Sequence, residues 1–131
     1  MRIGVFCPNW VGDAVMALPF LNACRDANPD ATIIAICKSW VAPIYENHHT
    51  IDGIISFHKK DLTGFRATDN AGRSLKALDL DRFYLLSDSY RAAYLAKKSE
   101  TAVRIGYPGQ GRSGLLTKII PRQKNKNASI I

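Results

Sequence analysis

The sequence lacks the short motifs that mark common cofactor and metal sites. No Gly-x-Gly-x-x-Gly follows the first predicted strand and no Gly-x-x-x-x-Gly-Lys-Ser/Thr occurs anywhere, so the usual dinucleotide and nucleoside-triphosphate fingerprints are missing. The three histidines, His48, His49 and His58, have no metal-ligand spacing on one helix face, and no cysteine accompanies them. Ser89 is without the glycines of a nucleophile elbow. We therefore expect no metal, no cofactor and no hydrolase triad.

Long apolar runs and paired cysteines are also missing. The longest stretch without a charged residue, Ala14 to Cys24, has eleven residues, whereas a membrane span needs roughly 20. The three cysteines form no Cys-x-x-Cys pair, and their odd number and apolar neighbours indicate buried thiols in a reducing compartment. With 131 residues, of which 47% are hydrophobic, the chain has the size and composition of one globular domain. These features predict a soluble, cytoplasmic domain.

Acidic residues are absent after Glu100. The chain has 18 Lys and Arg against 11 Asp and Glu, a net charge of +7, and six basic residues follow Glu100 unopposed. This bias favours an anionic partner, such as a phosphate-bearing substrate, an acidic membrane surface or nucleic acid. Nucleic acid is the weakest of these because no aromatic residues interleave with the basic ones and no recognition motif is present. For residues 123 to 129, a solvated and partly disordered tail is the preferred interpretation.

Short apolar runs, typical of strands, alternate along the chain with segments in which apolar residues recur every three or four positions, as in helices. Short runs rich in β-formers predict five strands, at Arg2–Phe6, Ala31–Cys37, Asp52–Phe57, Arg82–Leu86 and Ala102–Gly106. The remaining periodicity predicts four helices, at Val11–Asn28 with a kink at Pro19, from a Ser39 cap through Tyr45, at Gly72–Leu80 and at Ser89–Lys98. Polar residues 58–70 predict a long mobile loop, and 107–114 a glycine-rich one.

This alternation indicates an α/β fold: a Rossmann-like parallel sheet with helices on both faces. Ligands of such sheets bind at the carboxyl ends of the strands. The candidate binding segments are therefore residues 7–13, 58–70 and 107–114, with 87–91 between them.

Asp13 stands at the predicted start of the first helix, after the turn Asn9-Trp10-Val11-Gly12. One interpretation is structural, since an N-cap or first-turn acid satisfies free backbone N–H groups. The other is chemical, because a carboxylate at the mouth of the sheet can act as general base towards a substrate hydroxyl. Gly12 permits a tight turn or the close approach of a ligand. Trp10 is either a packing residue or a surface on which a sugar ring stacks.

Ser89 is the expected N-cap of its helix, and Arg91 follows in the first turn. A positive charge opposes the helix dipole at this end, so Arg91 should have another partner, for which an anion is a candidate. Arg112 lies among the glycines of the last loop, which serve either as turn residues or as ligand contacts.

Three segments resemble the ADP-heptose:lipopolysaccharide heptosyltransferases of glycosyltransferase family nine, closest to heptosyltransferase II. They are Met-Arg-Ile-Gly-Val at 1–5 with Pro-Asn-Trp-Val-Gly-Asp-Ala-Val-Met at 8–16, Leu-Ser-Asp-Ser-Tyr-Arg-Ala-Ala at 86–93, and Arg-Ile-Gly-Tyr at 104–107 running on to Gly-Leu-Leu at 114–116. The resemblance spans nearly the whole chain in register. It departs from the family at Asp88, where members typically carry Asn.

The resemblance implies that the chain is the N-terminal half of a GT-B fold. Residues 1–122 would be the acceptor-binding domain, and 123–131 a basic, disordered tail or the start of a linker. The implied reaction is an inverting, metal-independent transfer of heptose from ADP-heptose to the lipopolysaccharide inner core, with Asp13 as the base. Lys59 and Lys60 fall in the loop that reaches towards the anionic acceptor in relatives. The other implied substrate contacts are Trp10, Gly12, Ser89, Arg91 and Arg112.

Family members continue into a C-terminal donor domain, which these 131 residues do not contain. We therefore expect ADP-heptose to be bound only through that missing domain, and the chain alone to be an inactive part of a bacterial enzyme. Its implied location is the cytoplasm, with a peripheral contact to the inner membrane as a further expectation. The alternative is a non-catalytic, Rossmann-like binding module for an anionic glycan or nucleotide.

Overall fold

A parallel sheet of six strands, in the order β3-β2-β1-β4-β5-β6, forms the centre of the computed structural model. Residues 1–87, 89–107 and 113–120 are described. The strands are β1 (Arg2–Phe6), β2 (Thr32–Lys38), β3 (Gly53–Phe57), β4 (Arg82–Leu85), β5 (Val103–Gly106) and β6 (Lys118–Ile119). Each strand pairs in parallel with its neighbours. The chain adds β2 and β3 on one side of β1 and then crosses back to add β4, β5 and β6 on the other side. The order of the strands thus reverses between β1 and β4, and such a switch point opens a crevice at the carboxyl edge of the sheet.

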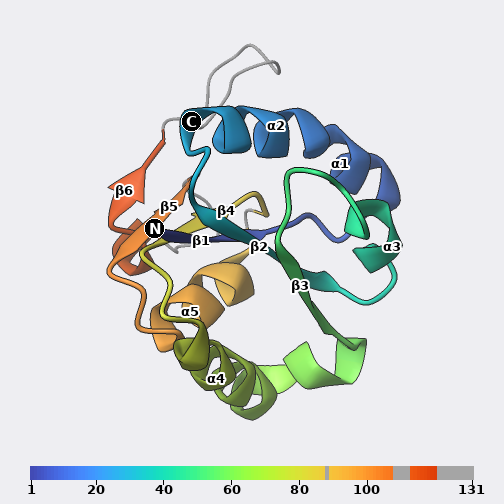
Figure 1. Ribbon diagram of the computed structural model, residues 1–131. Helices are drawn as coiled ribbons and strands as arrows, with labels where there is room; N and C mark the ends of the chain where they lie inside the picture. Colours follow the sequence, from blue (N-terminus) through green and yellow to red (C-terminus); the bar gives the residue numbers. More distant parts are fainter. Residues whose placement is uncertain (88, 108–112, 121–131) are drawn as a thin grey trace.

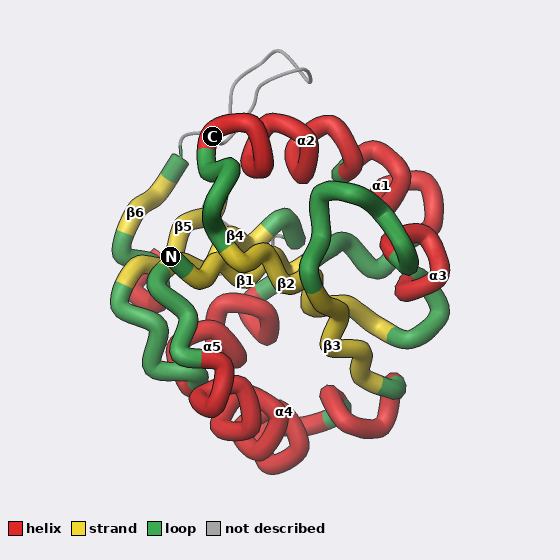
Figure 2. Tube along the Cα trace, viewed as in Figure 1, coloured by secondary structure: helices red, strands yellow, loops and turns green. Residues whose placement is uncertain are grey.

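Helices cover both faces of the sheet, as Figures 1 and 2 show. The α-helices are α1 (Val11–Met16), α2 (Leu18–Ala27), α3 (Ala42–Tyr45), α4 (Gly64–Ser74) and α5 (Tyr90–Lys98). Three short 3-10 helices accompany them: η1 (Lys59–Leu62), η2 (Leu75–Leu78) and η3 (Ser113–Leu115). The helices α1, α2 and α3 lie on one face, and α4 and α5 on the other. The Rossmann-like fold predicted from the sequence is confirmed.

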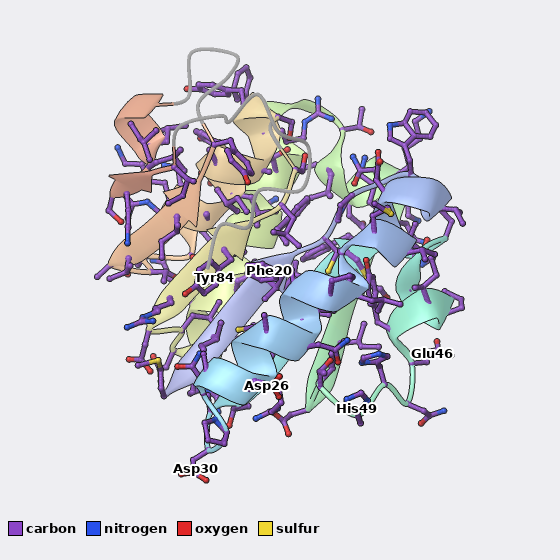
Figure 3. All side chains as sticks on the ribbon, turned by 90° about the horizontal axis from the view of Figure 1, so that it is seen from above. Phe20, Asp26, Asp30, Glu46, His49 and Tyr84 are labelled. Atoms are coloured by element: carbon purple, nitrogen blue, oxygen red, sulfur yellow. The ribbon has the colours of Figure 1, made fainter. Side chains whose placement is uncertain are left out.

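The apolar strands bury both of their faces. In β1, Ile3 and Val5 belong to the core beneath α1 to α3, whereas Phe6 belongs to the core beneath α4 and α5. Side chains alternate in β2 in the same way. Phe20 of α2 packs edge-on against Tyr84 of β4, with ring centroids 5.2 Å apart (Figure 3). Polar groups of β1 and its neighbours are thereby restricted to the two edges of the sheet.

The predicted kink at Pro19 is confirmed as a break between two helices. The first helix ends at Met16 and the second begins at Leu18, with Pro19 in its first turn. Proline has no N–H to donate to the preceding turn, so the break falls where that hydrogen bond would be missing. The break leaves α1 as a separate short helix beside the carboxyl edge.

Three predictions between residues 39 and 80 differ from the structure. Ser39 caps no helix: α3 begins at Ala42, and the Ser39 N–H donates to the Phe57 carbonyl at 2.8 Å. Residues 58–70 are not a loop but η1 and most of α4, and the helix predicted over 72–80 is the end of α4 followed by η2. The buried residues of α4 are small, namely Thr68, Ala71 and Gly72, so its packed face gives little hydrophobic signal.

Gly72 sets how closely α4 approaches α5. A Cβ at this position would lie 2.6 Å from the Cβ of Lys98 and 2.8 Å from the carbonyl oxygen of Leu95. The oxygen belongs to the backbone and cannot rotate away, so the two helices can touch only because residue 72 has no side chain. These helices carry much of the pocket described below.

We expect Gly72→Ala to lower the free energy of unfolding by about 1–3 kcal/mol, because the added methyl overpacks the helix contact. Urea unfolding followed by circular dichroism measures this. Gly12→Ala is the matched control, since its Cβ would meet nothing within 4 Å and should leave stability unchanged or slightly raised. Equal stability of Gly72→Ala and the wild type would contradict the close approach.

The opposite, amino edge of the sheet is tied together by Arg25 and Asp52. The Arg25 guanidinium donates to the Asp52 carboxylate at 2.6 Å and to the carbonyls of Ala31 and Thr50 at 2.7 and 3.0 Å. The same carboxylate accepts the Ile33 N–H of β2 at 2.8 Å. The Ile33 N–H, and after it Arg25, hold the pKa of Asp52 below its ordinary value.

Because the folded-state pKa of Asp52 is lowered, its contribution to stability is present above the unfolded pKa of about 3.9 and is lost as pH falls through the folded value. We expect Asp52→Asn to be less stable than the wild type at pH 7 and the difference to shrink in acid. Thermal melts across this pH range measure it. Asp30→Asn, at an exposed position, is the control, and a difference that stays constant down to the lowest pH would refute the assignment.

Candidate functional site

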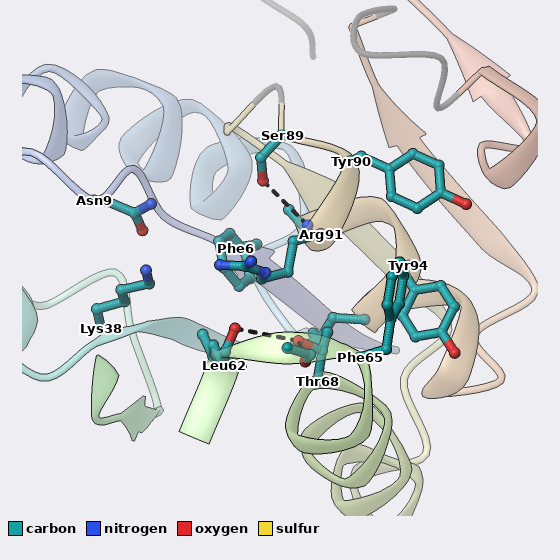
Figure 4. Close-up of a pocket in the computed structure, with 13 residues that line it drawn as sticks. Phe6, Asn9, Lys38, Leu62, Phe65, Thr68, Ser89, Tyr90, Arg91 and Tyr94 are labelled. Atoms are coloured by element: carbon teal, nitrogen blue, oxygen red, sulfur yellow. Dashed lines mark hydrogen bonds between the residues drawn. The ribbon is translucent and has the colours of Figure 1, made fainter. Parts of the chain in front are cut away.

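A pocket of about 370 Å³ opens where the carboxyl ends of β1 and β2 meet the first turns of α4 and α5. It is the crevice expected at the switch point of a doubly wound sheet. Its lining residues come from these elements and their flanking loops: Phe6, Asn9, Lys38, Leu62, Gly64, Phe65, Thr68, Ser89, Tyr90, Arg91, Ala92, Tyr94 and Leu95. Figure 4 shows Asn9 and Lys38 on one side of it. Phe65, Tyr90 and Tyr94 lie on the opposite side, with Phe6 and Arg91 between the two groups.

Positive charge gathers on one side of the pocket. Partial burial, and after it the charges of Arg91 and Lys59, hold the pKa of Lys38 below its ordinary value. Cations of η1 and α5 therefore act on Lys38 of β2 at this corner. Within the described residues neither Lys38 nor Arg91 takes part in an ion pair, so an anion entering the pocket would relieve their mutual repulsion.

Asn9 adds a polar group to the cationic side. Its side-chain oxygen is buried and has no hydrogen-bond partner among the described residues. The Asn9 backbone is fixed, because its carbonyl accepts the indole N–H of Trp40 at 2.6 Å. The Trp40 ring also lies 5.3 Å from the Lys38 ammonium. A ligand hydroxyl could supply the hydrogen bond that the Asn9 oxygen lacks.

The first turn of α5 is built as the sequence predicts. Ser89 is the N-cap, and its hydroxyl accepts the Ala92 N–H at 3.1 Å. This bond aligns the first turn, so that Ser89 and Arg91 both line the pocket. The capping role of Ser89 is confirmed, whereas its contact with a substrate stays a prediction.

The first turn of α4 forms the other lip of the pocket. Gly64 begins the helix with a φ of +83°, a conformation that side chains disfavour. The buried Thr68 hydroxyl donates to the Gly64 carbonyl at 2.8 Å. The sequence placed residues 58–70 among the candidate binding segments, and this location is confirmed, but the loop predicted there is helical. Lys38 and Trp40 were not predicted, and only their place at the end of the second strand gave a signal.

Asp13, Gly12 and Trp10 do not line the pocket but stand beside the same edge, at the start of α1, whereas Asn9 of the same turn does line it. Trp10 is the N-cap residue, no side chain caps this helix, and Asp13 occupies the first turn with an exposed side chain. Asp13 is therefore not an N-cap, whereas the first-turn position that the structural interpretation also allowed is confirmed. Trp10 is 76% exposed and so does not serve as core packing. Gly12 has a helical conformation with open space around it, so no tight turn requires it.

The remaining predicted substrate contacts, Lys59, Lys60 and Arg112, lie outside the pocket lining or outside the described residues. Lys59 and Lys60 lie exposed in η1, and the charge of Lys59 contributes to the lowered pKa of Lys38. Arg112 lies outside the described residues, as do Asp88 and the tail from 123 to 131.

Within the described part of the chain no cluster of three or more His, Cys, Asp or Glu could hold a metal ion. None of the described helices is long and apolar enough to cross a membrane.

Comparison with known proteins gives a consistent result. No family model matches the chain. Lipopolysaccharide heptosyltransferase 2 of Escherichia coli K12 is 28% identical over 122 residues, which cover 91% of this chain and 34% of that enzyme. The solved structure of the E. coli ADP-heptose heptosyltransferase II superposes over 96% of this chain with a TM-score of 0.79 and 26% identity. The predicted resemblance to the heptosyltransferases is confirmed.

A second structure supports the fold. A glycosyltransferase of family nine from Veillonella parvula covers 95% of this chain and 37% of its own, with a TM-score of 0.86 and 24% identity. The chain thus spans about a third of the length of the heptosyltransferases that it matches. It corresponds to a heptosyltransferase-like, Rossmann-like region of such enzymes.

The electrostatic coupling within this heptosyltransferase-like pocket can be measured directly. We expect Arg91→Ala to raise the pKa of Lys38, because the substitution removes a like charge that disfavours the ammonium form. An NMR titration of the Lys38 side chain measures the change. Arg66→Ala, which removes an exposed cation of α4 outside the pocket, should leave this pKa unchanged. A Lys38 pKa that fails to rise in Arg91→Ala would show that the two cations are not coupled.

Proposed function

We propose that this chain is the acceptor-binding region of an inverting glycosyltransferase that moves heptose from ADP-heptose to the lipopolysaccharide inner core. The observation that carries the proposal is the match to heptosyltransferase 2 over 91% of the chain. The E. coli relative is named for heptose transfer to lipopolysaccharide, and the solved neighbour for ADP-heptose. The acceptor domain would comprise residues 1–122, with 123–131 leading towards a separate donor-binding domain.

Asp13 is the proposed general base. Its carboxylate is exposed at the carboxyl edge, and no hydrogen bond or ion pair within the described residues occupies it. In the proposed step it takes the proton of an acceptor hydroxyl while that oxygen bonds to the anomeric carbon of the donor sugar. The bond from this carbon to the ADP phosphate breaks on the opposite face, so ADP leaves and the configuration inverts. The proposed chemistry uses no metal and no cofactor.

The cationic side of the pocket is the proposed anchor for an anionic group of the acceptor. Lys38 and Arg91 supply the charge there, and Ser89 and Asn9 supply polar atoms. Lys59 and Lys60 on η1, and Trp10 and Gly12 on α1, would contact parts of the acceptor outside the pocket. Arg112 is retained as a proposed contact from the sequence resemblance alone.

The proposed setting follows from the proposed substrate. An inner-core lipopolysaccharide precursor is carried by a lipid, so the enzyme would work in the bacterial cytoplasm at the surface of the inner membrane. The net charge of +7 supports such a contact, because anionic lipids attract basic surfaces. ADP-heptose would be bound by the donor domain.

A second candidate is a non-catalytic module that binds an anionic glycan or nucleotide. The observation in its favour is that the described residues of this chain build the pocket without any second domain. In this case ligand binding would weaken with added salt and would not depend on Asp13.

A chimera separates the two candidates. We propose to replace the matching third of E. coli heptosyltransferase 2 with this chain and to measure heptose transfer. Asp13→Asn should lower kcat by about 10²-fold or more while the KM for acceptor changes little, because the general base acts in the transition state. Asp26→Asn is the matched control: Asp26 is also an exposed acid of the α1–α2 pair but lies at the far end of α2 (Figure 3).

An active chimera in which Asp13→Asn keeps full kcat would refute the base assignment. A folded chimera that binds acceptor but transfers no heptose would favour the binding module.

A further inference from the structure

One wall of the pocket is aromatic, and the proposed transfer step makes no use of it. Phe65, in the first turn of α4, lines the pocket and is nevertheless 72% exposed. Tyr94 of α5 stands behind it, with ring centroids 5.7 Å apart and planes at 76°. This geometry is the edge-to-face arrangement that aromatic pairs prefer. An exposed phenylalanine in a pocket is an apolar surface that a ligand can cover.

The aromatic wall is held in place from behind. The Tyr94 hydroxyl donates to the Asp69 carboxylate at 3.4 Å, and the Lys98 ammonium lies 5.4 Å from the centroid of the Tyr94 ring. Asp69 is itself paired with Arg73 at 2.7 Å and with Lys98 at 3.4 Å. This network fixes Tyr94, and its ring in turn supports Phe65. A surface ordered in advance costs little conformational entropy when a ligand binds.

The pocket therefore has two unlike sides. Lys38 and Arg91 supply positive charge, and the aromatic wall across from Lys38 supplies an apolar face (Figure 4). A pyranose ring with an anionic substituent has the matching pattern, because its axial C–H bonds form an apolar face and its substituents are polar. A nucleobase matches less well, since Phe65 and Tyr94 are not parallel and form no clamp for a flat ring.

We propose that Phe65 is a sugar-stacking residue, on which the acceptor ring lies with its anionic substituent directed towards Lys38 and Arg91. This assignment rests on the proposed function for the nature of the acceptor. It gives Phe65 a role in selecting a sugar acid or sugar phosphate over a simple anion. The cations alone would bind both.

Binding to the 131-residue chain tests the assignment. The probes are glucose 6-phosphate, inorganic phosphate and AMP, titrated by NMR at one ionic strength. Phe65→Ala should weaken glucose 6-phosphate binding by about three- to tenfold and leave phosphate binding unchanged, because only the sugar contacts the ring. Arg91→Ala should weaken both. Phe65→Tyr should retain sugar-phosphate affinity, whereas Phe65→Leu, which keeps apolar bulk without a ring, should not.

Val103→Ala, which truncates an exposed apolar side chain of β5 outside the pocket, is the matched control and should change no affinity. Three results would overturn the proposal: equal effects of Phe65→Ala on sugar phosphate and phosphate, AMP binding that depends on Phe65 more strongly than glucose 6-phosphate does, or no binding of glucose 6-phosphate by the wild type. The chimera assay reports on Asp13 independently. If Asp13 is not the base, the effect of Phe65 on sugar-phosphate binding would remain. If Phe65 does not stack on the sugar, the effect of Asp13 on heptose transfer would remain.

Discussion

Burial of the parallel sheet on both faces is the constraint on which the rest of the molecule depends. Ile3 and Val5 of β1 have no exposed surface on one side, and Phe83 and Leu85 of β4 have none on the other. A strand covered in this way has no room for an unpaired polar group along its length. The groups that can do chemistry therefore stand where the strands end, and the switch between β1 and β4 opens the space in which a ligand can meet them.

The distribution of charge reinforces this division between the two edges. Arg25 and Asp52 pair with each other at the amino edge, and Asp69 pairs with Arg73 and Lys98 on the outside of α4 and α5. At the carboxyl edge, Lys38 and Arg91 have no acidic partner within the described residues. Ion pairs that stabilise the fold are thus kept away from the crevice, and cations that repel each other are concentrated in it. Repulsion of this kind costs stability and favours the binding of an anion.

The exposed carboxylate and the pocket are two separate parts of one edge. Asp13 is held on α1, a short helix that exists as a separate element because Pro19 interrupts the hydrogen bonding that would join it to α2. The pocket is held between α4 and α5, which approach closely because Gly72 has no side chain. Different local rules therefore position the proposed base and the proposed acceptor site. This makes their roles separable by mutation.

The sequence by itself determined five of the six strands and much of the carboxyl edge, whereas the two-residue β6 and the strand order were not predicted. Apolar runs around Ile3, Ile34 and Phe83 identified buried strands, Pro19 identified the helix break, and Ser89 identified a helix cap, because each of these signals is local. Only the tertiary structure decided the pocket. Helix α4 is recognisable through its contact with α5, since its buried face consists of Thr68, Ala71 and Gly72, and hydrophobic periodicity does not detect small residues. Lys38, Phe65 and Arg91 are far apart in the chain and share one pocket only because β2 ends, and α4 and α5 begin, at the same edge of the sheet.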